Sequence, residues 1–364
     1  MSDTFDVVVA GLGIHGSAAT FELAARGVRV LGLDRFARGH ARGSSHGRTR
    51  MIRRAYPNPV WNDFVDRAQQ GWARWERATG RPLLHRTGGV YAHPGTSQLQ
   101  GPGCVRVEDP DALRSLASGL SLPSGWAAVH DPSAGVVEAA AALQVARDGA
   151  CGHGAELAFG ERVLRWEQTV DGCLVHTDRR TVRAGRLVLA GGAWNGELEP
   201  SLAGLFSVWR ILTATFRSGQ AVAQPPSLTA FSVDRPDGLV FGLPDVDGSG
   251  FKVGIDAEHP WDPELAPAPP TAAEVDRLVA TATALVPGLE PDVVEAVACL
   301  YTMTEDKRFV LGALPHAPEV VVASACSGHG FKFGPAVGEA VADLCQDVPR
   351  PDLEFIGTDR RVAA

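Results

Sequence analysis

The N-terminal segment changes from an unbroken apolar run to a helical repeat and back to an apolar run. Residues 5–11, "FDVVVAG", and residues 27–34, "GVRVLGLD", are both apolar enough to form buried strands. Between them, apolar positions recur at helical spacing until about Gly27. This order predicts a strand, a helix and a second, parallel strand, which together form a βαβ unit.

Two later segments repeat the change from an apolar strand to a glycine-rich turn. Residues 185–195 read "GRLVLAGGAWN", and residues 319–344 run from "EVVVASACSGHG" into a helical pattern. Three such junctions, spread over the whole chain, indicate one nucleotide-binding domain built from distant pieces. We predict that this domain comprises residues 1–85, 135–205 and 291–364.

The intervening segments have a different pattern. Residues 238–244 and 250–256 alternate between apolar and other positions as strands do, and residues 271–286 have helical periodicity. They predict an α+β substrate domain at residues 86–134 and 206–290. The expected fold class is therefore α/β plus α+β, with a Rossmann-like nucleotide-binding domain of discontinuous segments and an inserted domain that contains a mixed or antiparallel sheet.

The turn after the first strand has the spacing of a dinucleotide-binding motif. Gly11, Gly13 and Gly16 give G-x-G-x-x-G, and Asp34 follows at close to the roughly 20-residue spacing of the fingerprint. These glycines allow a tight turn, a close approach to pyrophosphate and close packing of helix on strand, while the acid accepts hydrogen bonds from a ribose. NAD and FAD both fit this motif, and the discontinuous domain favours FAD. His15, inside the turn, is expected to be solvated, and the alternative is that it contacts phosphate.

Composition and charge narrow the class of protein. The chain has 364 residues, of which 45% are hydrophobic, so it can bury a large core and form about two domains. Its net charge of -8 disfavours nucleic acid or an anionic membrane as the main partner. No signal peptide is visible, and no apolar run approaches the roughly 20 residues that span a bilayer. We expect a cytoplasmic monomer.

The six cysteines show neither a C-x-x-C pair nor a regular framework, which favours free thiols in a reducing compartment. Cys299 follows an apolar, strand-like run, and a buried cysteine is most often a small hydrophobe. Cys326 reads as a packed turn residue, because its C-x-x-H spacing lacks the second ligand pair of a zinc site. No metal site is predicted.

Residues 39–56, "GHARGSSHGRTRMIRRAY", are rich in arginine although the chain is acidic overall. Local positive charge beside glycine and serine favours an anion site close to the backbone. The alternative is a solvated basic loop.

Here the sequence resembles the FAD-dependent amine oxidases of the D-amino-acid-oxidase superfamily, in the branch of monomeric sarcosine oxidase and N-methyltryptophan oxidase. The resemblance covers nearly the whole chain. The motifs that carry it, in family order, are "GLGIHG", "SSHGRTRMIRRAY", "RTGGVY", "GGAWN", "GFKVG", "ACLYTMTEDKRFVLG" and "SGHGFKFGPAVGE".

The resemblance implies the cofactor and the reaction. In the family, the cysteine at the position of Cys299 forms a thioether with the 8α-methyl group of FAD, and attack by a thiolate that nearby positive charge activates is reasonable chemistry for such a bond. The family removes a hydride equivalent from the carbon beside a secondary amine of an α-amino acid. FAD then passes the electrons to O2, which gives hydrogen peroxide. The implied partners are therefore a small-molecule amino acid and O2.

The resemblance also implies roles for individual residues. It assigns the substrate carboxylate to Arg53 and Lys332, which suits the bidentate fork of arginine and the point charge of lysine. It assigns Arg50 and His46 to positions beside the flavin and Tyr301 to a position over the substrate.

The family lysine at the position of Lys252 promotes the reaction of reduced flavin with O2. An inward-pointing lysine in a strand is costly unless it is paired or functional, and the alternative is an edge-strand lysine in solvent. The residues predicted to contact the cofactor are Gly11, Gly13, Gly16, Asp34, Arg35, Ser44, Thr49, Val163, Gly192, Trp194, Cys299, Gly328, Gly330 and Lys332.

Two positions depart from the family. Where sarcosine oxidase has a tyrosine and a histidine beside the substrate, this chain has Phe241 and Asp256. An anion at Asp256 would favour a cationic or hydrogen-bond-donating substituent, unless the side chain turns into solvent or pairs with a nearby cation. We therefore expect sarcosine to be a poor substrate and a larger amino acid with a secondary or cyclic amine to be a better one.

Three alternatives remain open on the sequence. The first is an NAD-linked dehydrogenase, which leaves the two C-terminal motifs unexplained. The second is an FAD-linked oxidase or dehydrogenase of imino acids or fructosyl amino acids. The third is a catalytically silent flavoprotein subunit, against which the retained Lys252, Arg53 and Lys332 argue.

Overall fold

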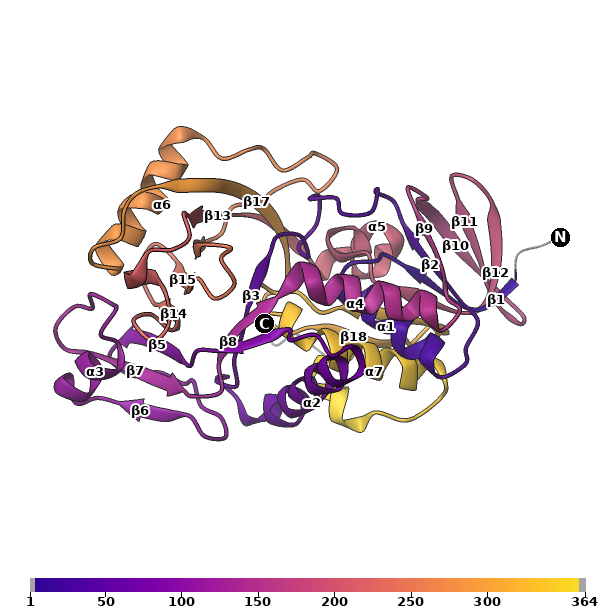
Figure 1. Ribbon diagram of the computed structural model, residues 1–364. Helices are drawn as coiled ribbons and strands as arrows, with labels where there is room; N and C mark the ends of the chain where they lie inside the picture. The colour runs from indigo at the N-terminus through magenta and orange to yellow at the C-terminus, as the bar shows by residue number, and fades with distance from the viewer. Residues whose placement is uncertain (1–3, 360–364) are drawn as a thin grey trace.

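The structure, a computed structural model, describes residues 4–359, which form two lobes (Figure 1). The lobe that carries the N-terminus contains an eight-stranded mixed sheet in the order β10-β11-β12-β1-β2-β9, with β19 paired to β12 and β18 paired to β19. Strands β1, β2, β9, β12 and β19 pair in parallel, so their carboxyl ends meet at one edge. The strands are β1 Thr4–Ala10, β2 Val30–Asp34, β9 Glu156–Phe159, β10 Val163–Thr169, β11 Gly172–Thr177, β12 Thr181–Leu189, β18 Val310–Leu314 and β19 Ala317–Ser324.

Apolar helices cover this first sheet. Helices α1 (Ile14–Ala25) and α7 (Gly334–Cys345) pack on it through buried residues such as Leu23 and Val337. Two more helices, α2 (Asn62–Thr79) and α4 (Ala139–Gly152), pack beside them. The predicted βαβ unit is confirmed, and the helix ends close to Gly27, whose φ of +79° a side chain would disfavour.

The second lobe contains an eight-stranded sheet in the order β17-β13-β16-β15-β14-β5-β7-β6, one face of which is packed against helix α6 (Figure 1). Its strands are β5 Gly89–Pro94, β6 Val105–Val107, β7 Trp126–Asp131, β13 Ser207–Phe216, β14 Ala230–Val233, β15 Leu239–Leu243, β16 Phe251–Asp256 and β17 Val293–Met303. A small sheet, β3-β8-β4, consists of β3 Thr49–Ile52, β8 Gly135–Glu138 and β4 Leu84–Arg86. The predicted fold class, with its mixed and antiparallel sheets, is confirmed.

Local signals predicted three elements of the second lobe. Strands β15 and β16 lie within the predicted residues 238–244 and 250–256, and α6 (Ala272–Leu285) lies within 271–286. Helix α6 begins after a capping box, in which the side chains of Thr271 and Glu274 each accept a hydrogen bond from the other's backbone N–H. The remaining helices are α3 Pro110–Leu116, α5 Asn195–Leu198, and the 3₁₀ turns η1 Pro59–Trp61, η2 Gly192–Trp194, η3 Pro200–Leu205, η4 Ala221–Ala223, η5 Phe331–Phe333 and η6 Pro351–Ile356.

Strand β17 crosses between the lobes. It lies inside residues 291–364, which the sequence assigned to the nucleotide-binding domain, yet it pairs along its length with β13 of the second sheet. The domain ranges stay a prediction, and the pairing of β17 argues for moving residues 293–303 to the substrate domain. The strand brings Cys299 and Tyr301 to the junction of the two lobes.

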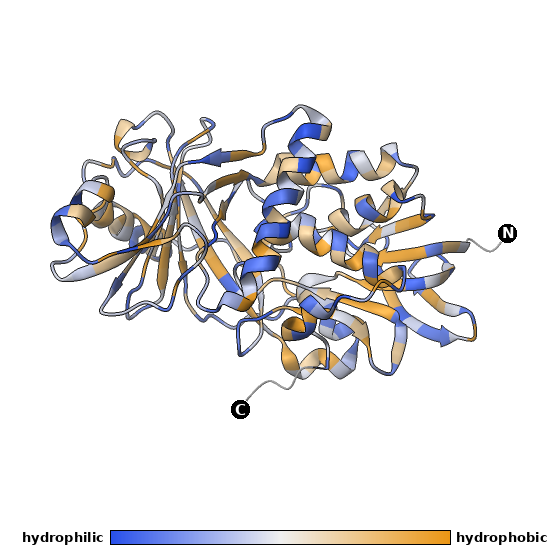
Figure 2. Ribbon diagram, turned by 90° about the horizontal axis from the view of Figure 1, so that it is seen from below, coloured by the Kyte–Doolittle hydropathy of each residue, from blue (hydrophilic) through white to orange (hydrophobic). Residues whose placement is uncertain are grey.

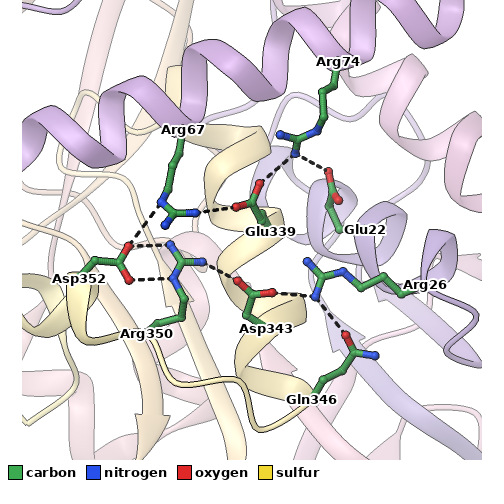
Figure 3. Close-up of polar contacts among 9 residues, drawn as sticks. All are labelled: Glu22, Arg26, Arg67, Arg74, Glu339, Asp343, Gln346, Arg350 and Asp352. Carbon is green, nitrogen blue, oxygen red and sulfur yellow. Dashed lines mark hydrogen bonds and ion pairs between the residues drawn. The ribbon is translucent and has the colours of Figure 1, made fainter.

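A network of ion pairs ties together the helices that cover the first sheet (Figure 3). Arg350 is nearly buried and lies 2.8 Å from both Asp343 and Asp352. The network continues through Arg67 and Glu339, at 3.0 Å. The network links α1, α2, α7 and η6, and it therefore stabilises the packing of the helices next to the glycine-rich turns.

Figure 2 shows hydrophobic stretches along the strands of both lobes, while the helices carry hydrophobic and hydrophilic residues in alternation. No helix among the described residues is long and apolar enough to cross a membrane.

Candidate active site

A cavity of about 600 Å³ lies at the carboxyl ends of the parallel strands in the first sheet. Its walls include Gly11 after β1, Asp34 at the end of β2, Gly191 after β12 and Cys326 after β19. Open α/β sheets bind ligands outside the carboxyl ends of their strands. This cavity, called the nucleotide cavity below, is therefore where the glycine motif predicts a dinucleotide.

The glycine turn leaves no room for side chains. A β-carbon on Gly11, whose φ is +102°, would lie 2.4 Å from the carbonyl oxygen of Ala190, and one on Gly16 would lie 1.8 Å from that of Gly11. Helix α1 begins directly after this turn and has no acidic residue in its first turn. Its positive end therefore borders the cavity with no carboxylate from its own first turn, which suits a phosphate group.

Asp34 is held as an acceptor at the other side of the turn. Its Oδ2 accepts from the backbone N–H of Leu12 at 3.0 Å and its Oδ1 from that of Phe36 at 2.9 Å. Burial alone would raise the pKa of Asp34, but these hydrogen bonds and the contact with His40 outweigh it and lower the pKa. The carboxylate therefore stays ionised at the edge of the cavity.

The structure brings together most, but not all, of the residues predicted to contact the cofactor. Those that line the nucleotide cavity are Gly11, Gly13, Asp34, Arg35, Ser44, Val163, Gly192 and Trp194, together with His46. Those outside its lining are Gly16, Thr49, Cys299, Gly328, Gly330 and Lys332. Of this second group, Cys299 lies on β17 of the second sheet, and the carbonyl oxygen of Thr49 contacts Lys252 of that sheet.

The alternation of side chains gathers the other predicted residues on one face of the second sheet. On β16, Phe251 and Val253 pack against α6, so Lys252, Gly254 and Asp256 point to the opposite face. This opposite face is called the inner face below. Phe241 of β15 pairs with Gly254 and lies on the inner face, because a β-carbon on Gly254 would be 2.4 Å from its ring.

Strand β17 adds Cys299 and Tyr301 to the inner face. These two residues pair with Ile211 and Trp209 on β13. Ile211 and Trp209 lie on the same face of β13 as Thr213, which pairs with Gly254 of the inner face. The inner face therefore carries Lys252, Asp256, Phe241, Cys299 and Tyr301.

Lys252 is a central-strand lysine rather than an edge-strand one, because β16 lies between β13 and β15. Its Nζ donates to the carbonyl oxygen of Thr49 at 3.3 Å, across the junction of the lobes. Burial and, next, the positive charge of Arg50 lower the pKa of Lys252 to about 7. The solvent-facing alternative is therefore wrong for this lysine.

Arg50 and His46 lie where the arginine-rich segment passes between the lobes. Arg50 donates to the carbonyl oxygens of Thr49 and Ser44, both at 2.7 Å, and to that of His46 at 2.5 Å. Burial and then the charges of Arg50 and Lys252 lower the pKa of His46 to about 4, so its ring is neutral at pH 7. Nε2 of His46 is buried and has no hydrogen-bond partner among the described residues.

Two cysteines lie near the junction. Cys299 is buried, and burial raises the pKa of its thiol although Arg50 and Lys252 oppose that shift. Cys326 lines the nucleotide cavity, and its sulfur accepts from the backbone N–H of Thr302 at 3.3 Å. Cys326 is thus a cavity residue as well as a turn residue. Either thiol is therefore a candidate for covalent attachment of a cofactor.

Arg53 and Lys332 form a pair of cations with no carboxylate partner in the described part of the chain. Arg53 lies over the rings of Tyr56 and Tyr91, with its guanidinium carbon 5.1 and 5.4 Å from their centroids. Burial and then the charge of Arg53 push the pKa of Lys332 well below its usual value. Within residues 4–359, no carboxylate lies within 4.0 Å of the charged nitrogens of either residue. Two like charges held together at a buried site favour an anionic ligand.

A chain of hydrogen bonds orients Lys332. Its Nζ donates to the carbonyl oxygen of His329 at 2.6 Å and to Oη of Tyr56 at 3.3 Å. Nε2 of His329 lies 2.9 Å from the carbonyl oxygen of Lys307 and must donate to it, so Nδ1 accepts from Tyr56 at 3.2 Å. Two of the three N–H bonds of Lys332 are therefore used within the protein, and one is left for a ligand.

The comparisons with known proteins decide the family. Residues 6–344 match the FAD dependent oxidoreductase (DAO) family. The chain belongs to this family. It is 36% identical to the monomeric sarcosine oxidase of Streptomyces avermitilis over 94% of both chains, and 28% identical to the N-methyl-L-tryptophan oxidase of Yersinia pestis over 95% of this chain and 96% of that one. Among solved structures, the open form of NikD, an unusual amino acid oxidase, superposes with a TM-score of 0.82 at 26% identity over 98% of both chains.

Membership of the FAD-dependent oxidoreductase family answers the choice between NAD and FAD, and the cavity fits FAD. The glycine cradle, the positive end of α1 and the ionised Asp34 suit a pyrophosphate and a ribose. The orphaned Nε2 of His46 offers a hydrogen bond where the cavity meets the inner face. In this family site, Asp34, the glycine turn and His46 would hold the cofactor, which supplies a two-electron acceptor.

Several residues of the site were missed or misjudged from the sequence. His15 was expected to be solvated, but its Nε2 donates to the carbonyl oxygen of Gly330 at 3.1 Å, and burial lowers its pKa to about 4. Arg147 lines the nucleotide cavity and donates to the carbonyl oxygen of Leu12. The sequence signal that could have identified Arg147 is that it is the one arginine in the alanine-rich helix α4. Tyr56 and His329 lie inside motifs of the family, and the fold brings Tyr56 to the segment that contains His329 and Lys332.

Proposed function

We propose that this protein is an oxidase of secondary α-amino acids, which takes a hydride equivalent from the carbon beside the amine and leaves an imine. The FAD of this family would supply the two-electron acceptor, and O2, with two electrons and two protons, would leave as hydrogen peroxide. The observation that carries the proposal is the cation pair Arg53 and Lys332, which has no carboxylate partner within residues 4–359 and whose arginine acts electrostatically on Asp256 of the inner face.

The side chains of this site would then divide the work. Arg53 and Lys332 bind the carboxylate of the amino acid and so fix its position. His46 is neutral and offers Nε2 to the cofactor, while Arg50 holds the backbone of the arginine-rich segment. Lys252 places a charge where negative charge develops on oxygen, and Tyr301 covers the substrate from β17.

A screen for peroxide tests the proposal. The purified protein should be yellow and should release hydrogen peroxide with sarcosine, N-methyl amino acids, proline or pipecolate, with no need for NAD. The matched control is an N-methyl amine that lacks the carboxylate, which should react much more slowly. Bleaching of the flavin by an amine without peroxide formation would instead indicate a dehydrogenase, and no bleaching with any amine would indicate a silent flavoprotein.

We also propose that FAD is attached covalently through Cys299. Support comes from the inner-face position of this thiol, beside the cations Arg50 and Lys252, whose charges stabilise a thiolate. Because burial raises the pKa of Cys299, we expect attachment to be slow and to speed up as pH rises.

Intact mass should show one FAD per chain in the wild type and none in Cys299→Ser. The matched control is Cys326→Ser, which alters the cavity thiol and should keep the adduct. Loss of the adduct in Cys326→Ser but not in Cys299→Ser would move the assignment to Cys326. A wild type at apoprotein mass, with all its colour released by acid, would refute covalent attachment.

A further inference from the structure

Asp256 stands at the end of β16, on the inner face and two residues beyond Gly254. A β-carbon on Gly328, whose φ is +75°, would lie 3.3 Å from Oδ2 of Asp256 and 3.0 Å from the ring of Tyr301. The carboxylate, the ring and the glycine backbone therefore share one corner of the site. Only a glycine at position 328 keeps this corner open.

The carboxylate of Asp256 is not satisfied by the protein. Its Oδ1 is buried and has no hydrogen-bond partner among the described residues. The cations Lys307 and Arg53 act on it electrostatically, but in the described part of the chain neither lies within the 4.0 Å of an ion pair. The sequence left two alternatives for Asp256, a side chain in solvent and a side chain paired to a cation. Neither describes Oδ1, which is buried and unpaired among the described residues.

An unpaired, buried carboxylate oxygen carries a desolvation cost that a hydrogen-bond donor would relieve. The neighbouring groups do not supply that donor. Phe241 fills the adjacent position with an apolar ring, and the Tyr301 side chain presents ring carbons to this corner. The register of β16, β13 and β17 places Asp256 on the same inner face as Tyr301 and Cys299.

We propose that Asp256 is a specificity residue that accepts a hydrogen bond from a cationic or N–H group on the side chain of the substrate. The proposal rests on the proposed oxidase function. The substrate class is then a secondary α-amino acid with three recognised parts: a carboxylate at Arg53 and Lys332, the reacting amine, and a second nitrogen at Asp256.

Matched substrates isolate this contact. Nα-methyl derivatives of 2,4-diaminobutyrate, ornithine and lysine are each compared with the N-methyl amino acid whose side chain has the same length but ends in a methyl group. For the best-fitting length, kcat/KM should be roughly tenfold to a hundredfold higher for the diamino acid, as expected for one charge-assisted hydrogen bond. The ratio is the readout, so a general loss of activity does not mimic the effect.

Asp256→Asn should bring this ratio close to one, and Asp256→Leu should reverse it in favour of the apolar side chain. The matched control is Asp276→Asn, which makes the same charge change at an exposed position on α6, behind the opposite face of the sheet, and should keep the wild-type ratio. A ratio near one in the wild type at every length, or a ratio that survives Asp256→Asn, overturns the proposal and leaves water as the partner of Asp256. Absence of peroxide with every substrate would instead refute the oxidase function itself.

Discussion

Replacing Lys252 with methionine should slow the reoxidation of reduced flavin by O2 roughly a hundredfold, the scale of losing one preorganised charge, and should change anaerobic flavin reduction far less. Lys252 projects from the centre of the second sheet and is held against the carbonyl oxygen of Thr49. Its position does not depend on the amino acid, so its loss should not disturb the hydride step. Stopped-flow absorbance measures the two half-reactions separately.

The pKa of about 7 gives this prediction a pH dependence. Burial and Arg50 lower the pKa of Lys252, while Cys299 and Glu295 oppose that shift. The ammonium is therefore present below about pH 7 and lost above it, so reoxidation should slow as pH rises through this value. Negative charge on a reduced cofactor would move the transition upward by stabilising the ammonium.

The control for charge is Lys252→Arg, which stays ionised at all working pH values and should remove the pH dependence. If the reduced flavin of Lys252→Met is reoxidised at the wild-type rate, the lysine only stabilises the junction between the lobes through its contact with Thr49 and does not promote the reaction with O2.

The parts of the fold that could be predicted are those that short stretches of sequence specify. The glycine turn and Asp34 lie within one βαβ unit, where sterics and hydrogen bonding act over a few residues. The limits of α6 follow from the Thr271 capping box for the same reason. Alternation likewise predicted β16 as a strand.

Alternation could not predict which strands pair. Strand β17 has the pattern of any buried strand, and its partner β13 lies about eighty residues earlier in the chain. The same limit applies to Lys252, because an inward or an edge position depends on whether β13 and β15 flank it. Pairings of this kind are set by the packing of whole sheets and leave no local signature.

The site shows the same division. The resemblance predicts Arg53 and Lys332 as ligands of the carboxylate, because both lie in recognisable motifs. It did not supply the hydrogen-bond chain through Tyr56 and His329, since that chain joins segments more than 270 residues apart. Nor could it decide the orientation of Asp256, which depends on the space that Gly328 leaves free.

The second large effect is expected at the cation pair. A charge-assisted hydrogen bond to a buried anion contributes roughly 1.5–3 kcal/mol, so Arg53→Ala or Lys332→Met should weaken binding of the amino acid, and of a carboxylate inhibitor, by more than about tenfold. Arg53 should have the larger effect, because it can bind the carboxylate through two parallel N–H bonds whereas Lys332 has one free. Inhibitor titration of the flavin absorbance measures binding apart from turnover.

Two further variants separate recognition of the carboxylate from general damage to the site. Tyr56→Phe removes the hydroxyl that accepts from Lys332 and donates to His329, so it should loosen the orientation of the ammonium and raise KM by a smaller factor than Lys332→Met, with kcat little changed. Arg54→Gln removes the neighbouring cation, whose partner is Asp66 at 2.7 Å, and should leave inhibitor binding near the wild-type value. Equal turnover of an amino acid and its carboxyl-less amine by the wild type would contradict this assignment. So would equal inhibitor affinity in Arg53→Ala and Arg54→Gln, because the loss would then follow the charge of the segment and not the geometry of the cation pair.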